Sequence, residues 1–513
     1  MLNHDWVIAR GGFFFDLSAW PDQAPKDDPD QPLGSDFRAL HTVLAAASAM
    51  SEPWPVHIAG FTPWAYKYVG QKHPGVATEW QTIRIASAYT AFADADACCV
   101  GNMANAALFQ HYPLPALTPR PPAPAAAELV ARGVMDASGA VRPGLLLYFV
   151  YMGDYDSAAW AYGQLVPGHW EDPARGTAPL GWAVDPGLMP RFPPLFDVLT
   201  SEMAPGDALV TGDSGANYIN PSMLWASSRR GVSGLGDGWD AWQAWSEPLF
   251  AALGVRTTGF LITGDAPQLG PEGASRLARF SPNGAVLQAF PGVKPRLDPT
   301  GRMPMWEQTD LPGGVPPSDA ARTITSAVPA SPSAPTALHM FRTVLTSASF
   351  GTQVAGNATA ASGGRAVALD PVSLAYAARA LLSGRGLASN DDLPTVVGTG
   401  CPPSLPRPLP ASLSLDASVR NDGWVALPPV YELRVNATAL YAAAQPVQTG
   451  TASAALSAAG LAPGATAAVT ASVSLSGAPA GALAVLVSMQ PTGADGAPLQ
   501  GISPLLCVIP VGV

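Results

Sequence analysis

The sequence is poor in charged residues and contains no long hydrophobic run, and both shortages exclude classes of function. Charged residues make up only 13% of the 513 residues, the formal net charge is −11 and the pI is near 5.0. Nucleic-acid binding needs a basic surface, so this class of partner is excluded. No apolar run reaches the roughly 20 residues of a membrane-spanning helix. The 48% of hydrophobic residues predicts a packed globular protein.

Histidine and cysteine are also scarce, which argues against a metal centre. None of the seven histidines forms an HxxH or HExxH motif or a compact cluster with aspartates. Cys98, Cys99, Cys401 and Cys507 lack the spacing of metal ligands. Walker and GxSxG motifs are absent, which argues against nucleotide binding and an α/β-hydrolase site. We therefore expect no metal and no cofactor.

Short apolar segments alternate with amphipathic helical segments through the first 385 residues. Strands are predicted, in chain order, at residues 13–17, 56–61, 98–103, 145–152, 179–184, 208–211 and 259–263, with a weaker candidate at 303–306. Helices are predicted at residues 36–50, 78–95 and 370–382. This alternation predicts an α/β fold with a parallel core, in the form of a (β/α) barrel-like domain over residues 1–400.

The pattern changes after the proline-rich segment 402–410. Residues 412–513 alternate apolar and polar side chains in short runs that Gly and Pro separate. This alternation is typical of an all-β sandwich, which also commonly has about one hundred residues. The second predicted domain, an accessory one, is therefore a β-sandwich over residues 411–513.

Carboxylates follow most of the predicted strands of the first domain. In a (β/α) barrel the carboxyl ends of all strands converge on one face, so these groups would form an acidic cup. Each also has a simpler interpretation, because Asp156 can cap a helix, Asp185 can shape a turn before Pro186 and Asp213 can form an Asx turn. The strand-end carboxylates are Asp16, Asp154, Asp156, Asp185, Asp213, Asp265 and Glu307.

Aromatic and amide side chains accompany these carboxylates, and the combination suits a carbohydrate ligand. The stretch TGDSGANYINP, residues 211–221, presents a carboxylate, a hydroxyl, two amides and a tyrosine after one strand. Aromatic rings stack on the apolar faces of sugars, although the sequence does not distinguish aromatic residues of a sugar site from those of a buried core. The predicted substrate-binding residues are Trp64, Tyr155, Trp182, Asn217, Tyr218 and Glu307.

Hydrolysis of a glycosidic bond typically needs two carboxyl groups, one acid and one nucleophile or base. We expect Asp154 and Asp213 to fill these roles, with Asp16 or Asp265 in support. Asp154 follows an apolar strand and precedes aromatic residues, so it is the expected acid. Asp213 stands beside hydroxyl and amide groups and is expected to stay ionised.

At residues 215–221, GANYINP, the chain resembles the GxGYxYP family of putative glycoside hydrolases. Gly215, Tyr218 and Pro221 fit the motif that names the family, whereas Asn217 and Asn220 replace its second Gly and second Tyr. Further stretches resemble the family in the same order, so that the resemblance covers about residues 10–385. They are FFFDLSAWPDQAPKDDPDQPLGSD (13–36), HIAGFTPWAYKY (57–68), DADACCVGNMANAALFQHYP (94–113), YMGDYDSAAW (151–160), WEDPARGTAPLGWAVDP (170–186), LHMFRTVL (338–345) and VALDPVSLAYAARALL (367–382).

The resemblance implies a glycoside hydrolase that acts on a carbohydrate substrate. The alternative hypothesis is an inactive glycan-binding or cell-surface protein on the same scaffold, with no two cleft carboxyl groups within about 10 Å of each other. Family members usually carry a further domain ahead of this segment, so we expect a shortened N-terminus. An extracellular or secretory location is expected, although no signal peptide begins the sequence. Two glycosylation triplets begin at Asn357 and Asn436.

Overall fold

The computed structural model describes most of the chain. The described residues are 4–51, 53–94, 105–112, 125–262, 269–288, 294–383, 394–399, 405, 409–421, 432–440, 447–455, 466–476, 484–492 and 505–510. Within these ranges, the helices are too short or too polar to cross a bilayer.

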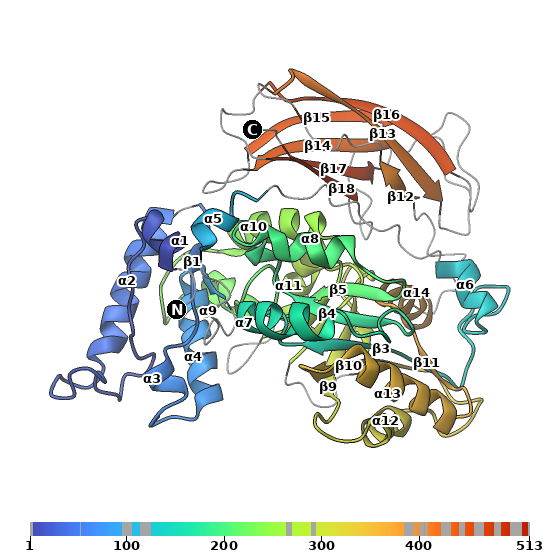
Figure 1. The fold of residues 1–513 in the computed structure, drawn as a ribbon, viewed down its shortest axis with the longest axis horizontal. Helices are drawn as coiled ribbons and strands as arrows, with labels where there is room; N and C mark the ends of the chain where they lie inside the picture. Colours follow the sequence, from blue (N-terminus) through green and yellow to red (C-terminus); the bar gives the residue numbers. More distant parts are fainter. Residues whose placement is uncertain are drawn as a thin grey trace.

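Seven parallel strands close into a barrel, which confirms the predicted barrel-like α/β fold (Figure 1). The strands pair with one another in the order in which the next sentence lists them, and β10 closes the ring by pairing with both β9 and β3. The barrel strands are β3 (Leu146–Gly153), β4 (Leu180–Val184), β5 (Asp207–Thr211), β6 (Thr258–Leu261), β7 (Ala285–Leu287), β9 (Pro304–Asp310) and β10 (Ala337–Val344).

Helices pack around the outside of this barrel, and two short strands extend it. The strands β8 (Arg296–Leu297) and β11 (Ala366–Ala368) pair with β9 and β3 respectively. The larger helices of this region are α8 (Pro193–Ser201), α10 (Trp239–Ala252), α11 (Gly270–Leu277), α12 (Pro317–Ser326), α13 (Ala348–Ala361) and α14 (Pro371–Leu382). Shorter helical segments are α6 (Ala125–Ala131), α7 (Ala158–Trp160), the π-helix η2 (Ala161–His169), the 3₁₀ helices η3 (Pro186–Leu188) and η4 (Pro221–Leu224), and α9 (Ala226–Arg229).

Large side chains of β3 fill the barrel interior opposite glycines on neighbouring strands. Phe149 and Tyr151 belong to a buried cluster that also contains side chains of β4, β5, β7, β9 and β10. A Cβ atom added at Gly181 would lie 2.5 Å from the Phe149 ring, and the Tyr151 hydroxyl donates to the carbonyl of Gly259. The interior is therefore a packed core, as expected for a small barrel.

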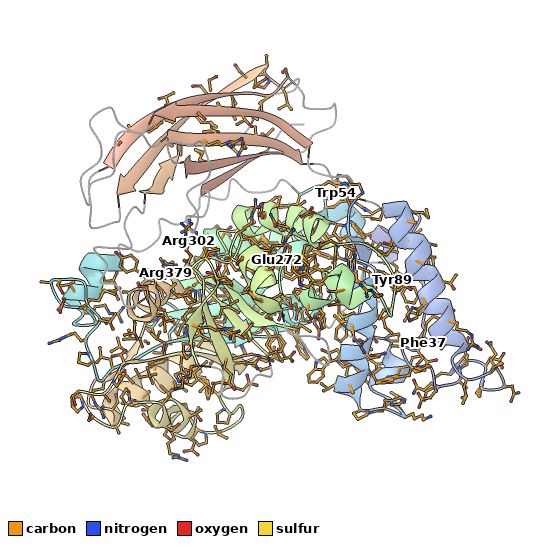
Figure 2. All side chains as sticks on the ribbon, turned by 180° about the vertical axis from the view of Figure 1, so that it is seen from behind. Phe37, Trp54, Tyr89, Glu272, Arg302 and Arg379 are labelled. Atoms are coloured by element: carbon orange, nitrogen blue, oxygen red, sulfur yellow. The ribbon has the colours of Figure 1, made fainter. Side chains whose placement is uncertain are left out.

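A separate N-terminal layer lies beside the barrel (blue in Figure 1). Its two parallel strands are β1 (Val56–Ile58) and β2 (Ala91–Ala93). Phe37 and Tyr89, labelled in Figure 2, contribute to this layer, and Tyr89 belongs to its buried cluster. Its helices are α1 (His4–Ala9), α2 (Ser35–Ser51), α3 (Trp64–Lys67) and α4 (Gly75–Ala88), followed by α5 (Ala106–Phe109).

Three predictions for this layer need correction, and a fourth lies outside the described residues. Residues 13–17 form no strand, because no segment among the described residues pairs with them and Phe13 and Phe14 stay exposed. Residues 56–61 do contain a strand, β1, but it belongs to the layer and not to the barrel. The helix predicted at 78–95 ends earlier, at Ala88, and β2 follows it. The strand predicted at 98–103 lies outside the described residues.

The C-terminal region forms two small antiparallel sheets, as its alternation predicts (orange to red in Figure 1). One sheet has the order β12-β13-β16 and the other β15-β14-β17-β18. Both contribute to one cluster of buried side chains. The strands are β12 (Pro394–Thr399), β13 (Ser412–Asn421), β14 (Glu432–Leu440), β15 (Val447–Ala455), β16 (Thr466–Ser474), β17 (Ala484–Thr492) and β18 (Leu505–Pro510).

Candidate functional site

Charged side chains gather at the carboxyl end of the barrel, where β3, β5, β9 and β10 end. Asp154 and Asp156 follow β3, Asp213 follows β5, Asp310 is the last residue of β9, and Arg342 lies near the end of β10. Because parallel strands of a barrel end on the same face, these groups come together although they are far apart in the sequence. Three aspartates of the expected acidic cup, Asp154, Asp156 and Asp213, therefore lie at this end of the barrel, together with Asp310, which the sequence analysis did not name.

Asp156 and Asp213 form a buried pair of carboxyl groups. Their side chains hydrogen-bond to each other, and the two residues are only 7% and 6% exposed. Burial raises the pKa of Asp213 well above its ordinary value, and the negative charge of Asp156 raises it further. A carboxyl group must carry a proton to donate such a bond, and the raised pKa of Asp213 favours Asp213 as the donor.

Gly212 allows this close approach. A Cβ atom added at Gly212 would collide with the Asp156 carboxylate, so only glycine leaves room for it beside β5. One oxygen of Asp213, Oδ2, is buried and has no hydrogen-bond partner among the described residues. A buried acceptor without a partner is costly, which is common at sites that bind a ligand.

Arg342 is the basic group of the cup. Its guanidinium donates to Oδ1 of Asp154 at 3.1 Å and lies 4.5 Å from the centre of the Phe260 ring. Burial alone would lower the pKa of Arg342, but the negative charges of Asp154 and Asp310 more than offset this effect and raise it. The Asp154 side chain is 33% exposed, so it is more accessible than the buried pair of Asp156 and Asp213.

A third buried carboxyl group, that of Asp185, orients the loop after β5. Its Oδ1 accepts from the Gly187 amide at 2.8 Å, which caps a short 3₁₀ helix, and its Oδ2 accepts from the Asn217 side chain at 2.9 Å. Asn217 in turn accepts from Trp245 Nε1 at 3.0 Å. Burial raises the pKa of Asp185 well above its ordinary value, and the charge of Asp94 adds to the rise.

Asp94 joins the N-terminal layer to the barrel. It follows β2, and its Oδ1 pairs with Arg191 at 2.7 Å and with His57 Nε2 at 2.9 Å. Asp94 and Arg191 are both only 1% exposed. Burial would raise the pKa of Asp94, but Arg191 and His57 more than offset this effect and lower it. The same burial lowers the pKa of His57.

The motif GANYINP anchors the N-terminal layer on the loop after β5. The Tyr218 amide donates to the Ala93 carbonyl at 2.9 Å, and the Ala93 amide donates back at 3.0 Å. The Tyr218 hydroxyl binds Glu79, which also pairs with Lys67. Tyr218 and Asn217 are almost fully buried, so they position the surrounding structure.

The backbone is strained where the barrel strands end. Asp154 has φ 69°, Asp213 has φ 39° and Ser214 has φ 76°, a region that residues with a side chain rarely adopt. Such conformations cost on the order of 1–3 kcal/mol each and concentrate at functional sites. The Ser214 hydroxyl accepts from the Ile262 amide at 2.6 Å, which ties this turn to the strand end of β6.

Of the predicted catalytic residues, Asp154 and Asp213 both follow barrel strands and therefore lie at the same end of the barrel. Asp16 is not part of this site, because its segment is not a barrel strand and the residue lies in the N-terminal layer. Asp265 lies outside the described residues. The expectation that Asp213 stays ionised is wrong, because its buried carboxyl group has a strongly raised pKa.

Most of the predicted substrate-binding residues do not reach an open surface. Tyr155 and Trp182 are completely buried; Trp182 donates to Asp207 Oδ1 at 3.0 Å, and Tyr155 donates to the Thr346 carbonyl at 3.1 Å. Glu307 alternates with the buried Trp306 on β9, so it lies on the outer face of the barrel, near His339. Trp64 is 49% exposed, on α3 of the N-terminal layer.

Sequence reasoning missed the roles of three residues. Asp156 was interpreted as a possible helix cap, but Ser157 occupies the cap position of α7. Arg342 lies within LHMFRTVL. It is two residues after Met340 and four after Leu338 on β10, so its side chain faces the barrel interior as theirs do. Only this position on the strand could have indicated its role. Glu79 stands on α4, where nothing in its neighbours distinguishes it. Across the described part of the chain, no three His, Cys, Asp or Glu side chains are arranged to hold a metal ion.

Comparison with known proteins identifies the central part of the chain. Residues 148–308 match the family described as "GxGYxYP putative glycoside hydrolase C-terminal domain". The resemblance is therefore confirmed for a segment that contains Asp154, Asp156, Asp185 and Asp213. No curated protein matches the sequence.

One similar solved structure agrees with the fold. A crystal structure of a putative hydrolase from Bacteroides thetaiotaomicron has 16% identity and a TM-score of 0.50, and the match covers 69% of this chain and 61% of that chain. The likeness concerns the fold alone, and the present chain spans about 61% of that protein's length. A beta-glucosidase from Listeria innocua in complex with glucose follows at 11% identity, with a TM-score of 0.16 and coverage of 59% and 45%. A TM-score this low supports no conclusion.

Proposed function

We propose that this protein is a glycoside hydrolase whose reacting carboxyl groups are Asp213 and Asp154. The hydrogen-bonded pair of Asp156 and Asp213 is the observation that carries the proposal. A family described as glycoside hydrolase matches the segment that contains it. A carbohydrate is the substrate class that follows from this family.

Asp213 is the proton donor in this proposal. Two carboxyl groups in a buried pair cannot both ionise easily, so one keeps its proton at a pH where an exposed aspartate has lost it. Ionised Asp156 accepts the bond from Asp213 and holds the proton there until the glycosidic oxygen takes it. This assignment reverses the roles expected from the sequence.

Asp154 is the ionised carboxylate, acting as nucleophile or base. Its contact with Arg342 favours the charged form, and its partial exposure leaves it within reach of a ligand. Retaining and inverting enzymes differ in the separation of the two carboxyl groups, about 5–5.5 Å against about 6.5–9.5 Å. Asp156, in direct contact with Asp213, is closer than either class requires, so it serves to position the proton.

The alternative of an inactive glycan-binding protein is less well supported. It predicts that no two carboxyl groups of the site lie within about 10 Å of each other. The direct bond between Asp156 and Asp213 speaks against it.

We also propose that the two antiparallel sheets form a β-sandwich accessory domain over residues 411–513, after a catalytic domain over residues 1–400. The shared cluster of buried side chains supports this division, because Leu415 and Val473 of one sheet pack with Val435 and Val487 of the other. Sheets that bury one common face in this way are typical of sandwiches.

Asp213→Asn and Asp154→Asn test the proposal on a panel of 4-nitrophenyl glycosides. Loss of an acid or base group is expected to lower kcat about 10²–10⁴-fold for whichever glycoside the wild-type protein hydrolyses. Asp240→Asn is the matched control, because Asp240 lies on α10 with a side chain that is 91% exposed. Full activity of either site variant would remove that residue from the mechanism, and hydrolysis of no glycoside by the wild-type protein would contradict the function itself.

A further inference from the structure

A pocket of about 560 Å³ lies in the N-terminal layer, outside the carboxylate site. Its walls come from α1, residues 12–16, α2, β1 and the segment from Ala59 to α3. The volume falls within the range of pockets that bind small molecules, roughly 300–1,000 Å³. The proposed catalytic mechanism does not use it.

Aromatic side chains dominate the walls of this pocket. Several of them are exposed although they are large and apolar, among them Phe14 at 42%, Trp64 at 49% and Tyr68 at 39%. Exposed apolar groups that gather around one concavity usually mark a binding site. The aromatic residues used here are Trp6, Phe14, Phe15, Phe61, Trp64 and Tyr68.

Few polar side chains face these rings. The lining includes Thr62, His57, Asp16 and Arg10. Thr62 is only 5% exposed, and its hydroxyl has no hydrogen-bond partner among the described residues. The Nε2 atom of His57 is already bonded to Asp94. The pocket therefore offers an unused hydroxyl and a largely apolar surface.

This lining suits an apolar ring better than a sugar ring. A pyranose carries several hydroxyl groups, and each one that is buried without a partner weakens binding. An aromatic or terpenoid ring needs no such partners and gains from contact with the aromatic walls. A lone polar substituent on that ring could bond to Thr62.

Phe61 links the pocket to the carboxylate site. Its ring lines the pocket and also stacks on Tyr218, with ring centres 5.7 Å apart and planes at 18°. Tyr218 binds Glu79, whose charge acts on Asp213. The Lys67 ammonium lies 4.3 Å from the centre of the Phe61 ring and pairs with Glu79. A chain of contacts through Phe61, Tyr218 and Glu79 therefore connects the pocket with Asp213.

We propose that this pocket binds the apolar, ring-shaped aglycone of the glycoside, with Trp64 and Phe61 as stacking walls and Thr62 as hydrogen-bonding partner. The inference rests on the proposed function, since it names the non-sugar half of the substrate. A pocket of this kind selects glycosides of aromatic or terpenoid alcohols over free oligosaccharides.

Calorimetric titration of the intact protein with two probes tests the pocket without relying on turnover. The probes are 2-naphthol, which has only the ring, and methyl β-D-glucopyranoside, which has only the sugar. We expect 2-naphthol to bind, and Trp64→Ala to weaken that binding about tenfold through loss of a stacking wall. Ala47→Trp, which fills the pocket from α2, should weaken it as well. Trp54→Ala is the matched control, because Trp54 is a tryptophan of the same layer that does not line the pocket (Figure 2).

Two results would overturn the inference. One is absence of 2-naphthol binding, or equal binding by the Trp64→Ala and Trp54→Ala variants. The other is a loss of methyl glucoside binding in Trp64→Ala with 2-naphthol unaffected, which would make the pocket a sugar subsite.

Failure of the proposed function has a different signature. The Asp213→Asn variant should bind 2-naphthol like the wild-type protein while its kcat falls about 10²–10⁴-fold. If the wild-type protein hydrolyses no 2-naphthyl glycoside but 2-naphthol binds in a Trp64-dependent manner, the pocket is supported and the hydrolase proposal fails.

Discussion

Asp213 shows how a single buried group can serve activity at the expense of stability. Its pKa is raised well above the ordinary value of 3.8, because burial and Asp156 disfavour the charged form. Below pH 3.8 both the folded and the unfolded protein carry the proton, so the ionisation of Asp213 does not change the free energy of unfolding there. As the pH rises from there through the folded-state pKa, the unfolded protein ionises more readily, and the free energy of unfolding falls.

We therefore predict that Asp213→Asn stabilises the protein at neutral pH. Asparagine does not ionise, and its amide can still donate to Asp156. The difference in Tm between variant and wild type should increase from pH 4 to pH 7, measured by thermal unfolding at intervals between them. Asp240→Asn should show no such trend, because Asp240 is exposed. A difference that is independent of pH, or that shrinks with rising pH, would contradict the raised pKa.

At this scale the sequence predicts position better than role. Asp154 and Asp213 could be placed at strand ends because each follows a recognisable apolar run. The partnership of Asp156 with Asp213 depends on the barrel bringing β3 and β5 near each other. The role of Arg342 could not be predicted for the same reason, because its contact with Asp154 joins residues 188 positions apart in the sequence.

At the scale of single elements, the barrel interior depends on pairing large residues with glycines. Phe149 and Tyr151 of β3 occupy space that a side chain at Gly181 of β4 would need. The neighbours of Gly181 are ring and Cβ atoms of a packed core, so they have little freedom to move.

Gly181→Ala is predicted to destabilise the protein by about 1–3 kcal/mol through overpacking. Gly356→Ala is the matched control, because Gly356 lies in the interior of α13 with open space around its Cα. Removing a helix glycine there should stabilise by about 0.5–1 kcal/mol. Urea unfolding of both variants gives the two free energies. Equal effects would mean that the interior of the barrel can relax around a methyl group.

Elements with a strong local pattern could be predicted, and those without one could not. β3, β4, β5 and α14 agree closely with the apolar runs and capping residues that predicted them. β7 was missed because three residues carry too short a pattern. Residues 13–17 were wrongly predicted as a strand, because three consecutive phenylalanines suit either a strand or the wall of a pocket.

At the scale of the whole molecule, the N-terminal layer was the least predictable part. Its position beside the barrel depends on contacts such as Asp94 with Arg191 and Ala93 with Tyr218. These residues are about one hundred positions apart or more, and nothing in their local sequence links them. The layer nevertheless matters to the site, because Glu79 and Phe61 belong to it.

The buried pair of Asp94 and Arg191 should hold the layer in place, and a double-mutant cycle measures this. Either Asp94→Asn or Arg191→Met leaves one buried charge without its partner, which is expected to cost about 3–5 kcal/mol of unfolding free energy. The double variant removes both charges and should be destabilised by clearly less than the sum of the single variants. The exposed pair of Asp319 and Arg322 is the control, with an expected coupling below about 1 kcal/mol. Additive single effects at Asp94 and Arg191 would mean that the layer is held by its apolar contacts, and that the ion pair only fills the space between layer and barrel.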